Sequence, residues 1–334
     1  MTSPGAPAPL VDLAAIRRAA ATLRGVASRT PLVPLGDPAR RHLLKAESLQ
    51  PIGAFKIRGA YNAAAALPAA DRARGLITYS SGNHAQGVAR AARLLGVPAV
   101  IVMPENAPAI KRARVLADGA EVVTVGNASA ERQAVAERLA AARGLAMIPP
   151  YDDDRIIAGQ GTCGLEIAED LPDLAAVLVP VGGGGLASGV AAAVKALRPA
   201  ARVIGVEPAL AADARESLAR GEIVEWSAAD VSRTIADGTR TQALGLRTFA
   251  HLRALLDGIV VVSEEEIAAA VRIAAEEARL VVEPSGALGI AALRFHAGEA
   301  GLEDAAGPVV CVVSGGNVDP ERYRAYLAAP IPSA

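Results

Sequence analysis

A run of four glycines, Gly182–Gly185, separates the apolar segment Ala176–Val181 from a segment with helical periodicity. Glycine lets backbone N–H groups point toward an anion, and the N-terminus of a helix adds a favourable dipole. We therefore expect a phosphate group here, because a tight turn between a strand and a helix would need only one or two glycines. The segment also fits the dinucleotide pattern G-x-G-x-x-A, with Glu207 lying 23 residues after Gly184, so NAD is an alternative ligand.

Lys56 lies in the sequence Gly53-Ala-Phe-Lys-Ile-Arg-Gly59, at the start of an expected helix. A lysine that forms a Schiff base with an aldehyde must be neutral, and burial in an apolar cleft lowers its pKa toward that state. The small residues Gly53, Ala54 and Gly59 would leave room beside it for a planar ring. From composition alone, an ordinary exposed lysine is the simpler interpretation.

Two further segments place polar side chains directly after expected strands. In Tyr79-Ser-Ser-Gly-Asn-His84, the hydroxyl groups, the amide and the N-terminus of the following helix can form a cradle for a carboxylate. Serine and asparagine also cap helices, which is the structural alternative. In Val313-Ser-Gly-Gly-Asn317, the serine hydroxyl can bond a flat ligand, but the same residues are common in turns, and the sequence alone leaves both interpretations open.

These segments follow short apolar runs that alternate with longer helical patterns. Such alternation predicts parallel sheets covered by helices, in which ligands bind at the carboxyl ends of the strands. The expected strands are His42–Ala46, Leu76–Tyr79, Ala99–Met103, Glu121–Val125, Ala176–Val181, Arg202–Glu207, Gly258–Val262 and Val309–Val313. The expected helices are Asp12–Arg24, Lys56–Leu67, Asn83–Leu95, Ala107–Ala117, Ser129–Ala142, Arg155–Asp170, Gly185–Leu197, Glu264–Leu280 and Ser285–His296.

The composition predicts a soluble, cytoplasmic protein with a large aliphatic core. The 334 residues suggest about two domains, and the net charge of −1 provides no basic excess for nucleic acid or an anionic membrane. Leu174–Val194 is uncharged and long enough to span a bilayer, but Pro180 and the glycine run interrupt it, which favours a strand, a loop and a buried helix. Met1–Leu10 lacks the features of a signal peptide.

Together these segments resemble the fold-type II family of enzymes that use pyridoxal 5'-phosphate (PLP), namely the threonine/serine dehydratases and serine racemases. The matching motifs occur in the family's order over roughly residues 30–319. They are Gly53-Ala-Phe-Lys-Ile-Arg-Gly-Ala60, Ser80-Ser-Gly-Asn-His-Ala-Gln-Gly87, Ala158-Gly-Gln-Gly-Thr162, Gly182–Gly185 and Ser314-Gly-Gly-Asn317. The resemblance implies an α/β fold of two doubly wound parallel-sheet domains with the cofactor in the cleft between them. A large PLP-binding domain would comprise residues 1–70 and 148–334, and a small substrate-loop domain residues 71–147.

The resemblance also implies roles for individual residues. Lys56, with Phe55 beside it in the cofactor site, would carry PLP as a Schiff base and exchange a proton with the substrate. Gly182–Gly185 would hold the phosphate, Asn83 would bond the 3'-oxygen and Ser314 would bond the pyridine nitrogen. PLP rather than NAD is then the ligand expected at the glycine run.

The same resemblance identifies the substrate loop. Ser80, Ser81, Gly82, Asn83 and His84 would bind the substrate carboxylate. Ser81 would also be catalytic, because serine racemases use a serine at this point to return a proton on the face opposite the lysine.

Glu207-Pro-Ala-Leu-Ala-Ala-Asp213 resembles the cation site of serine racemases and related dehydratases. The side chains of Glu207 and Asp213 and the carbonyl of Ala211 would bind Mg2+ or Ca2+, which prefer oxygen ligands. A solvated acidic helix start is the alternative.

The implied activity is that of an ammonia-lyase, converting L-threonine and/or L-serine to 2-oxobutanoate or pyruvate plus ammonia. A hydroxyl partner such as Ser314 does not keep the pyridine nitrogen protonated as a carboxylate would, which favours prompt loss of a β-hydroxyl group. Tyr151 stands where serine racemases have asparagine, which favours a dehydratase, whereas Ser81 keeps racemisation open. A dehydratase for 3-hydroxyaspartate is a further alternative. The family suggests a homo-oligomer acting on a small hydroxy amino acid.

Overall fold

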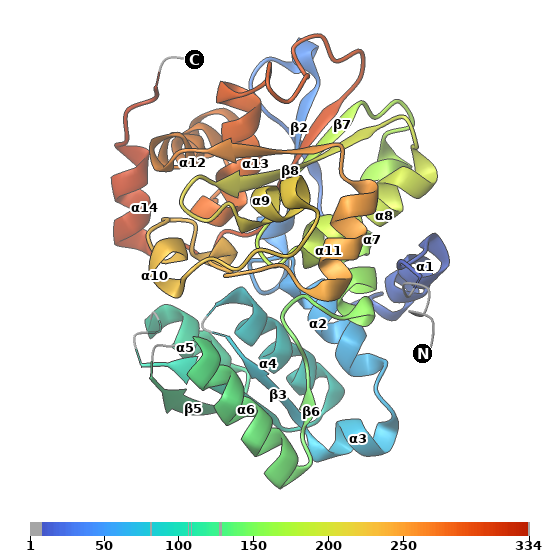
Figure 1. The fold of residues 1–334 in the computed structure, drawn as a ribbon, viewed down its shortest axis with the longest axis vertical. Coiled ribbons are helices and arrows are strands. Elements are labelled where there is room, and N and C mark those ends of the chain that lie inside the picture. The colour runs from blue at the N-terminus through green and yellow to red at the C-terminus, as the bar shows by residue number, and fades with distance from the viewer. Residues whose placement is uncertain (1–8, 81, 106, 108, 127–128, 333–334) are drawn as a thin grey trace.

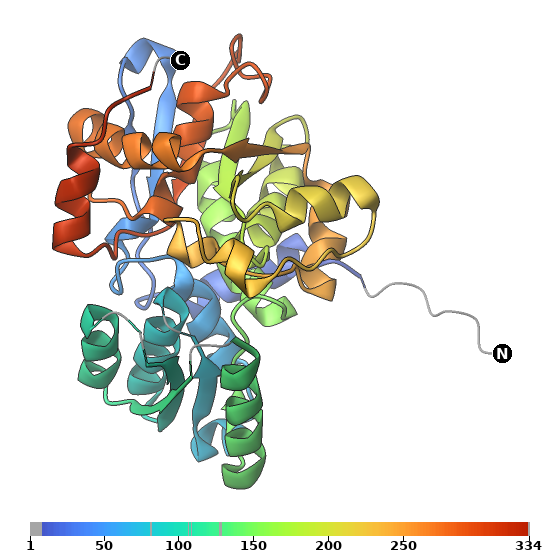
Figure 2. The same cartoon turned by 60° about the vertical axis from the view of Figure 1, so that its left-hand side comes forward.

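The chain folds into two α/β domains, each built around its own sheet (Figure 1 and Figure 2). The computed structural model describes residues 9–80, 82–105, 107, 109–126 and 129–332. Within these ranges, one sheet has six strands and the other has four. In Figure 1 the larger domain occupies the upper part of the view and the smaller domain, coloured cyan and green, the lower part.

The six-stranded sheet has the order β1-β2-β10-β7-β8-β9. These strands are β1 (Leu32–Pro34), β2 (His42–Ala46), β10 (Val309–Val313), β7 (Ala176–Pro180), β8 (Arg202–Pro208) and β9 (Gly258–Val262). All neighbours are parallel except β1, which pairs antiparallel with β2. Strand β10 is buried along its whole length, as its continuous apolar sequence predicts for a central strand covered on both faces.

The four-stranded sheet is parallel throughout, in the order β5-β4-β3-β6. Its strands are β3 (Leu76–Tyr79), β4 (Ala99–Pro104), β5 (Glu121–Val125) and β6 (Ala146–Met147). Alternate residues of β4 contribute to two separate clusters, with Ile101 in one and Val102 in the other. Both faces of this sheet are therefore covered, in agreement with the burial of every residue of β4.

Helices cover both sheets. They are α1 (Leu13–Thr22), α2 (Lys56–Ala65), α3 (Ala69–Arg74), α4 (Asn83–Leu95), α5 (Ala109–Ala117), α6 (Ser129–Arg143), α7 (Asp154–Asp170), α8 (Gly185–Leu197), α9 (Asp213–Arg220), α10 (Ala228–Val231), α11 (Leu246–Leu255), α12 (Glu264–Ala278), α13 (Pro284–Phe295) and α14 (Pro320–Leu327). Short 3-10 helices in the described ranges are η1 (Pro38–Arg40), η2 (Glu47–Leu49) and η3 (Asp237–Thr239).

Helix α7 packs against α2 and α8 through glycines. A Cβ atom on Gly159 would lie 2.6 Å from the carbonyl oxygen of Arg58, and one on Gly161 would lie 2.9 Å from the carbonyl oxygen of Gly189. Both separations are too short for a side chain, so glycine is what allows these helices to approach. Because α2 begins at Lys56 and α8 follows the glycine run, α7 sets the distance between these two segments.

The expected fold class is confirmed, and each expected strand and helix is present within two residues of its predicted ends. The large sheet departs from the prediction because its edge strand β1 is antiparallel. The segment Leu174–Val194 forms β7, the glycine loop and most of α8, and no helix in the described ranges is both long and apolar enough to cross a membrane. Strands β3 to β6 all lie between residues 76 and 147, while the proposed domain boundaries at 70 and 148 stay predictions.

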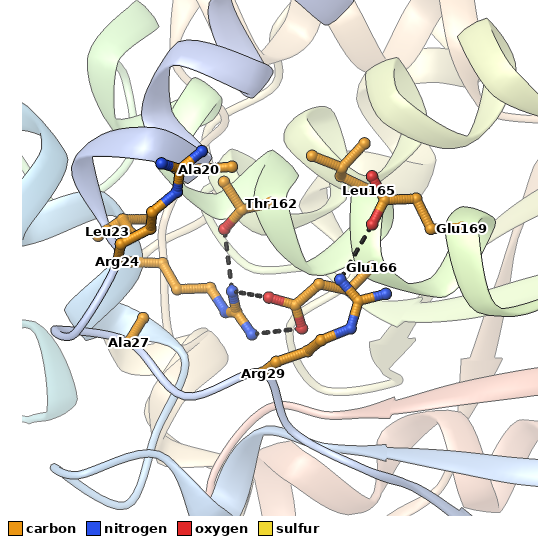
Figure 3. A pocket seen from close by; sticks show the side chains of 10 residues that line it. Ala20, Leu23, Arg24, Ala27, Arg29, Thr162, Leu165, Glu166 and Glu169 are labelled. Carbon is orange, nitrogen blue, oxygen red and sulfur yellow. Dashed lines mark hydrogen bonds and ion pairs between the residues drawn. The ribbon is translucent and has the colours of Figure 1, made fainter.

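A cluster of buried charges lies behind the start of α2. Arg58, which is 1% exposed, donates through Nε to Oε2 of Glu47 at 2.7 Å and through Nη1 to Oε1 of Glu166 at 2.7 Å. Lys45 also donates to Glu166, with Nζ 2.6 Å from Oε2. A pocket of about 230 Å³ lies beside Glu166 and Thr162, between α1 and α7 (Figure 3). Each buried charge in the cluster has an opposite partner, as burial of ions requires.

Replacing Arg58 with methionine should lower the free energy of unfolding by about 3–5 kcal/mol, because the buried carboxylate of Glu47 would lose its charged partner. Arg29→Met is the matched control, since Arg29 pairs with Glu169 and Asp170 at the surface, where such pairs contribute about 0–1 kcal/mol. Urea unfolding of the cofactor-free proteins measures both changes. Equal effects of the two substitutions would contradict the prediction.

Candidate active site

Lys56 and Ser314 come from distant parts of the chain but lie on adjoining backbone. An isolated antiparallel bridge joins Ala54 to Gly315, and the N–H of Phe55 donates to the carbonyl of Ser314 at 3.0 Å. The Ser314 hydroxyl is buried and lies 3.3 Å from the carbonyl oxygen of Ser285. The predicted cofactor-binding residues at the ends of β10 and the start of α2 are thus brought together.

The amine of Lys56 has a carbonyl rather than a carboxylate as its partner. Its Nζ donates to the carbonyl oxygen of Pro150 at 2.7 Å and lies 5.1 Å from the centre of the Phe55 ring. The surrounding protein displaces water from the ammonium group and lowers the pKa of Lys56 to about 8. In the described ranges no carboxylate lies within ion-pair distance of this amine to restore its charge. A substantial fraction of Lys56 is therefore neutral near pH 8.

The glycine run forms an open backbone loop between β7 and α8. Gly184 has a φ of 87°, a conformation that favours glycine. A Cβ atom on Gly183 would overlap with the ring of Tyr151, which lies against the loop. The buried Oγ1 of Thr241, 3.4 Å from the position of a Cβ atom on Gly182, has no hydrogen-bond partner among the described residues. A ligand with hydrogen-bonding oxygens could accept from this hydroxyl and from backbone N–H groups of the glycine loop.

The substrate loop leads into α4. The N–H of Gly82 lies 3.3 Å from the Ser80 hydroxyl, and Asn83 is the first residue of the helix. The other predicted residue, Ser81, lies outside the described part of the chain. The helix N-terminus provides a favourable dipole for a carboxylate.

His84, the second residue of α4, is buried and uncharged. Its Nε2 lies 3.0 Å from the carbonyl oxygen of Ile148, which can only accept, so the ring proton is on Nε2. Burial and the nearby charge of Lys56 lower the pKa of His84 to about 3. Its Nδ1 has no partner in the described structure and is a free acceptor. His84 therefore cannot supply a positive charge for a substrate carboxylate.

Glu207 and Asp213 form a separate buried acidic pair at the end of β8 and the start of α9. Glu207 accepts hydrogen bonds from the N–H groups of Ala214 at 3.0 Å and Arg215 at 2.7 Å. Both carboxylate oxygens of Asp213 are buried without a hydrogen-bond partner among the described residues. Burial raises the pKa of Asp213 to about 7, and burial together with Asp213 raises the pKa of Glu207.

A solvated acidic helix start does not describe this pair, because both side chains are fully buried. The unpartnered carboxylate oxygens fit a hard cation, which would replace the missing partners of Asp213. Ala211 is buried in the same turn. Among the described residues no group of three or more His, Cys, Asp or Glu side chains surrounds a metal position, so a cation would also need carbonyl or water oxygens.

Several residues at the site were not expected from the sequence. Glu283 accepts a hydrogen bond from Nδ2 of Asn83 at 2.6 Å, and burial and the charge of Asp237 raise its pKa to about 7. Lys111 of α5 is buried and pairs with Asp237 of η3, with Nζ 2.5 Å from Oδ2. The Nζ of Lys111 also lies 3.8 Å from the position of a Cβ atom on Gly82. No motif marks these residues: Lys111 stands beside other basic residues in α5, Asp237 begins η3, and Glu283 immediately precedes α13.

The segment Pro150–Asp152 was also missed as part of the site. Its proline carbonyl accepts from Lys56, its tyrosine ring lies against Gly183, and its aspartate accepts from the N–H groups of Arg247 at 2.8 Å and Thr248 at 3.1 Å. This tripeptide therefore joins the lysine, the glycine loop and the start of α11. The aromatic residue at 151 was the signal that could have identified it.

A family model described as "Pyridoxal-phosphate dependent enzyme" matches residues 23–315. The chain belongs to this family of PLP-dependent enzymes. PLP is therefore its cofactor, the resemblance seen in the sequence is confirmed, and the NAD alternative at the glycine run is wrong.

Relatives of this PLP-dependent enzyme differ in substrate. L-threo-3-hydroxyaspartate ammonia-lyase of Saccharomyces cerevisiae is 43% identical over 285 residues, which is 85% of each chain. L-threonine ammonia-lyase of Geobacter sulfurreducens is 46% identical over 275 residues, 82% of this chain and 67% of that protein. The structure of maize serine racemase is 37% identical, with a TM-score of 0.89, and the match covers 95% of this chain and 97% of that chain.

The rate at which the cofactor-free enzyme takes up PLP should follow the neutral fraction of Lys56. Below pH 8 the rate should rise roughly tenfold per pH unit, because only the neutral amine attacks the aldehyde, and it should level off above the pKa of about 8. Stopped-flow absorbance of the bound cofactor measures this profile. Lys195→Ala, which removes a lysine paired with Asp257, is the control and should leave the profile unchanged. A rate that still climbs toward the ordinary lysine pKa of 10.5 would contradict the prediction.

Proposed function

We propose that this PLP-dependent enzyme is an ammonia-lyase that converts L-threonine and/or L-serine to 2-oxobutanoate or pyruvate and ammonia. The observation that carries this proposal is the state of the Lys56 amine. The amine donates to a carbonyl, and its pKa is lowered to about 8. The backbone next to Lys56 also lies against the Ser314 segment. An amine in this state can act as a nucleophile toward an aldehyde and, once released, as a base. The relatives named as ammonia-lyases support the same reaction class.

The site residues fit PLP. The glycine loop would hold the phosphate through its backbone N–H groups, together with the Thr241 hydroxyl, which has no partner among the described residues. Ser314 would bond the pyridine nitrogen, Asn83 the 3'-oxygen, and Phe55 would lie beside Lys56 in the cofactor site. When bound, PLP stabilises negative charge that develops at the substrate Cα.

The chain's own residues would bind the substrate and move its protons. Ser80, Gly82 and Asn83, at the N-terminus of α4, would bind the carboxylate through donors and the helix dipole. His84 would contribute its free Nδ1 as an acceptor for a substrate proton donor, because it is neutral. Lys56 would take the Cα proton, and Ser81 stays the predicted residue on the opposite face.

A dehydratase for 3-hydroxyaspartate is a second candidate, favoured by one observation. The buried amine of Lys111 lies beside Gly82 of the substrate loop. There it could form an ion pair with a second carboxylate of the substrate. The yeast relative is named for this substrate. Serine racemase activity is a further alternative and depends on Ser81. The cytoplasmic location and homo-oligomeric state also stay predictions.

A substrate panel tests the proposed reaction. The holoenzyme should release ammonia and a 2-oxo acid from L-threonine or L-serine, and more slowly from L-threo-3-hydroxyaspartate. Borohydride should fix a pyridoxyl group on Lys56 and on none of the other three lysines, Lys45, Lys111 and Lys195. Predominant formation of D-serine would instead identify a racemase, and a faster reaction with 3-hydroxyaspartate would favour the second candidate.

Mg2+ or Ca2+ should raise the melting temperature of the holoenzyme at pH 8 if Asp213, Glu207 and the Ala211 carbonyl bind the cation as proposed, because a ligand specific to the folded state stabilises it. Asp213→Asn should abolish this increase, whereas the exposed-site control Asp304→Asn should retain it. Differential scanning fluorimetry with and without each cation measures the effect. A rise that persists in Asp213→Asn would rule out this site.

A further inference from the structure

A chain of side-chain hydrogen bonds crosses between the domains beside the site. Arg114 of α5 donates to Oδ1 of Asn317, which follows β10. Asn317 donates through Nδ2 to the carbonyl of Ile52 at 2.9 Å and to Oδ1 of Asn83 at 2.8 Å. Asn83 in turn donates through Nδ2 to Oε1 of Glu283 at 2.6 Å. These hydrogen bonds therefore connect Arg114 to Glu283 through the side-chain amides of Asn317 and Asn83.

The groups at the two ends of this hydrogen-bond series differ in whether they can donate or accept. A guanidinium can only donate and a backbone carbonyl can only accept, so Arg114 and Ile52 together allow one orientation of the Asn317 amide. In that orientation Asn317 offers N–H to Asn83, and Asn83 must turn its carbonyl toward Asn317. The amide nitrogen of Asn83 then faces Glu283 and retains a second N–H group for another acceptor.

Glu283 alone would not fix this orientation. Its Oε2 is buried with no hydrogen-bond partner among the described residues, and burial raises its pKa to about 7. When protonated, Glu283 can donate, and it would accept a reversed Asn83 amide with the carbonyl facing it. Arg114 offers no such alternative, because a guanidinium has donors and no acceptor. Arg114 therefore sets the donor-to-acceptor direction of all the hydrogen bonds between Arg114 and Glu283.

We propose that Arg114 is a positioning residue that orients Asn83, through Asn317, so that Asn83 presents an N–H group rather than its carbonyl to the cofactor. This rests on the proposed role of Asn83 in binding the 3'-oxygen of PLP. A reversed amide would place its carbonyl against that oxygen, and two acceptors facing each other weaken binding.

Helix α5 is suited to this role because it carries two residues that reach the large domain. Lys111 and Arg114 are three residues apart and so lie on one face of the helix. Lys111 pairs with Asp237, and Arg114 bonds Asn317. The orientation of Asn83 is thus tied to the contact between the domains.

Arg114→Met removes every donor while keeping a similar side-chain length, and Arg112→Met on the same helix is the matched control. We expect Arg114→Met to raise the dissociation constant for PLP about tenfold, which corresponds to one charge-assisted hydrogen bond. It should also change the ratio of the absorbance bands of bound PLP, which reports on hydrogen bonding to the 3'-oxygen. Both quantities are measured by titrating cofactor-free protein with PLP, without substrate.

Asn317→Asp provides the second arm of the experiment. An aspartate at 317 can still accept from Arg114 but cannot donate to Asn83 or to Ile52, so it should reproduce the affinity loss and the band change. In this background Arg114→Met should add nothing further, as expected for residues acting in series. The proposal is overturned if Arg114→Met behaves like Arg112→Met, if Asn317→Asp binds PLP as the unmodified protein does, or if the two effects simply add.

These readouts are independent of the reaction. An enzyme that shows the expected Arg114 effect on PLP binding but makes no 2-oxo acid from any substrate would retain this inference and lose the proposed function. Normal lyase activity with an unaltered spectrum in Arg114→Met would give the opposite result.

Discussion

The close approach of α7 to α2 and α8 is the constraint on which the site depends. Lys56 and the glycine loop are about 130 residues apart in sequence, and each begins a helix. Helix α7 touches both helices at positions where a Cβ atom would collide with backbone, namely Gly159 on one side and Gly161 on the other. The distance between Lys56 and the glycine loop is therefore set by contact between helix backbones. Backbone contacts of this kind deform less readily than contacts between flexible side chains.

The two basic residues of helix α2 lie in opposite electrostatic environments. Arg58 is buried between two carboxylates and keeps its charge, whereas Lys56, two residues earlier, meets only a carbonyl and has its pKa lowered to about 8. The carboxylates that bind Arg58 do not reach Lys56, because they lie on the side of the helix away from the site. If one of them reached Lys56, the amine would be held in its charged form and would lose its nucleophilic character.

Much of the fold could be predicted from the sequence, because strong apolar periodicity marks long elements. All eight expected strands are present, but β1 and β6, with three and two residues, are too short to produce a pattern. At the candidate site, motifs predicted the glycine loop, Lys56 and Ser314 as cofactor-binding residues. Glu283 and Arg114 were not predicted, because a local sequence pattern does not show which distant element a residue contacts. Arg114 and Asn317 are 203 positions apart, and nothing local in either segment indicates the other.

The tripeptide Pro150–Asp152 lies between β6 of the small sheet and α7 of the large domain. It is part of a linker that connects the two domains, and it also contacts Lys56, the glycine loop and α11. Any rotation of the smaller lobe must bend the chain close to these residues. The segment that links the two domains thus also contacts Lys56, so a change in the arrangement of the domains would alter the surroundings of this amine.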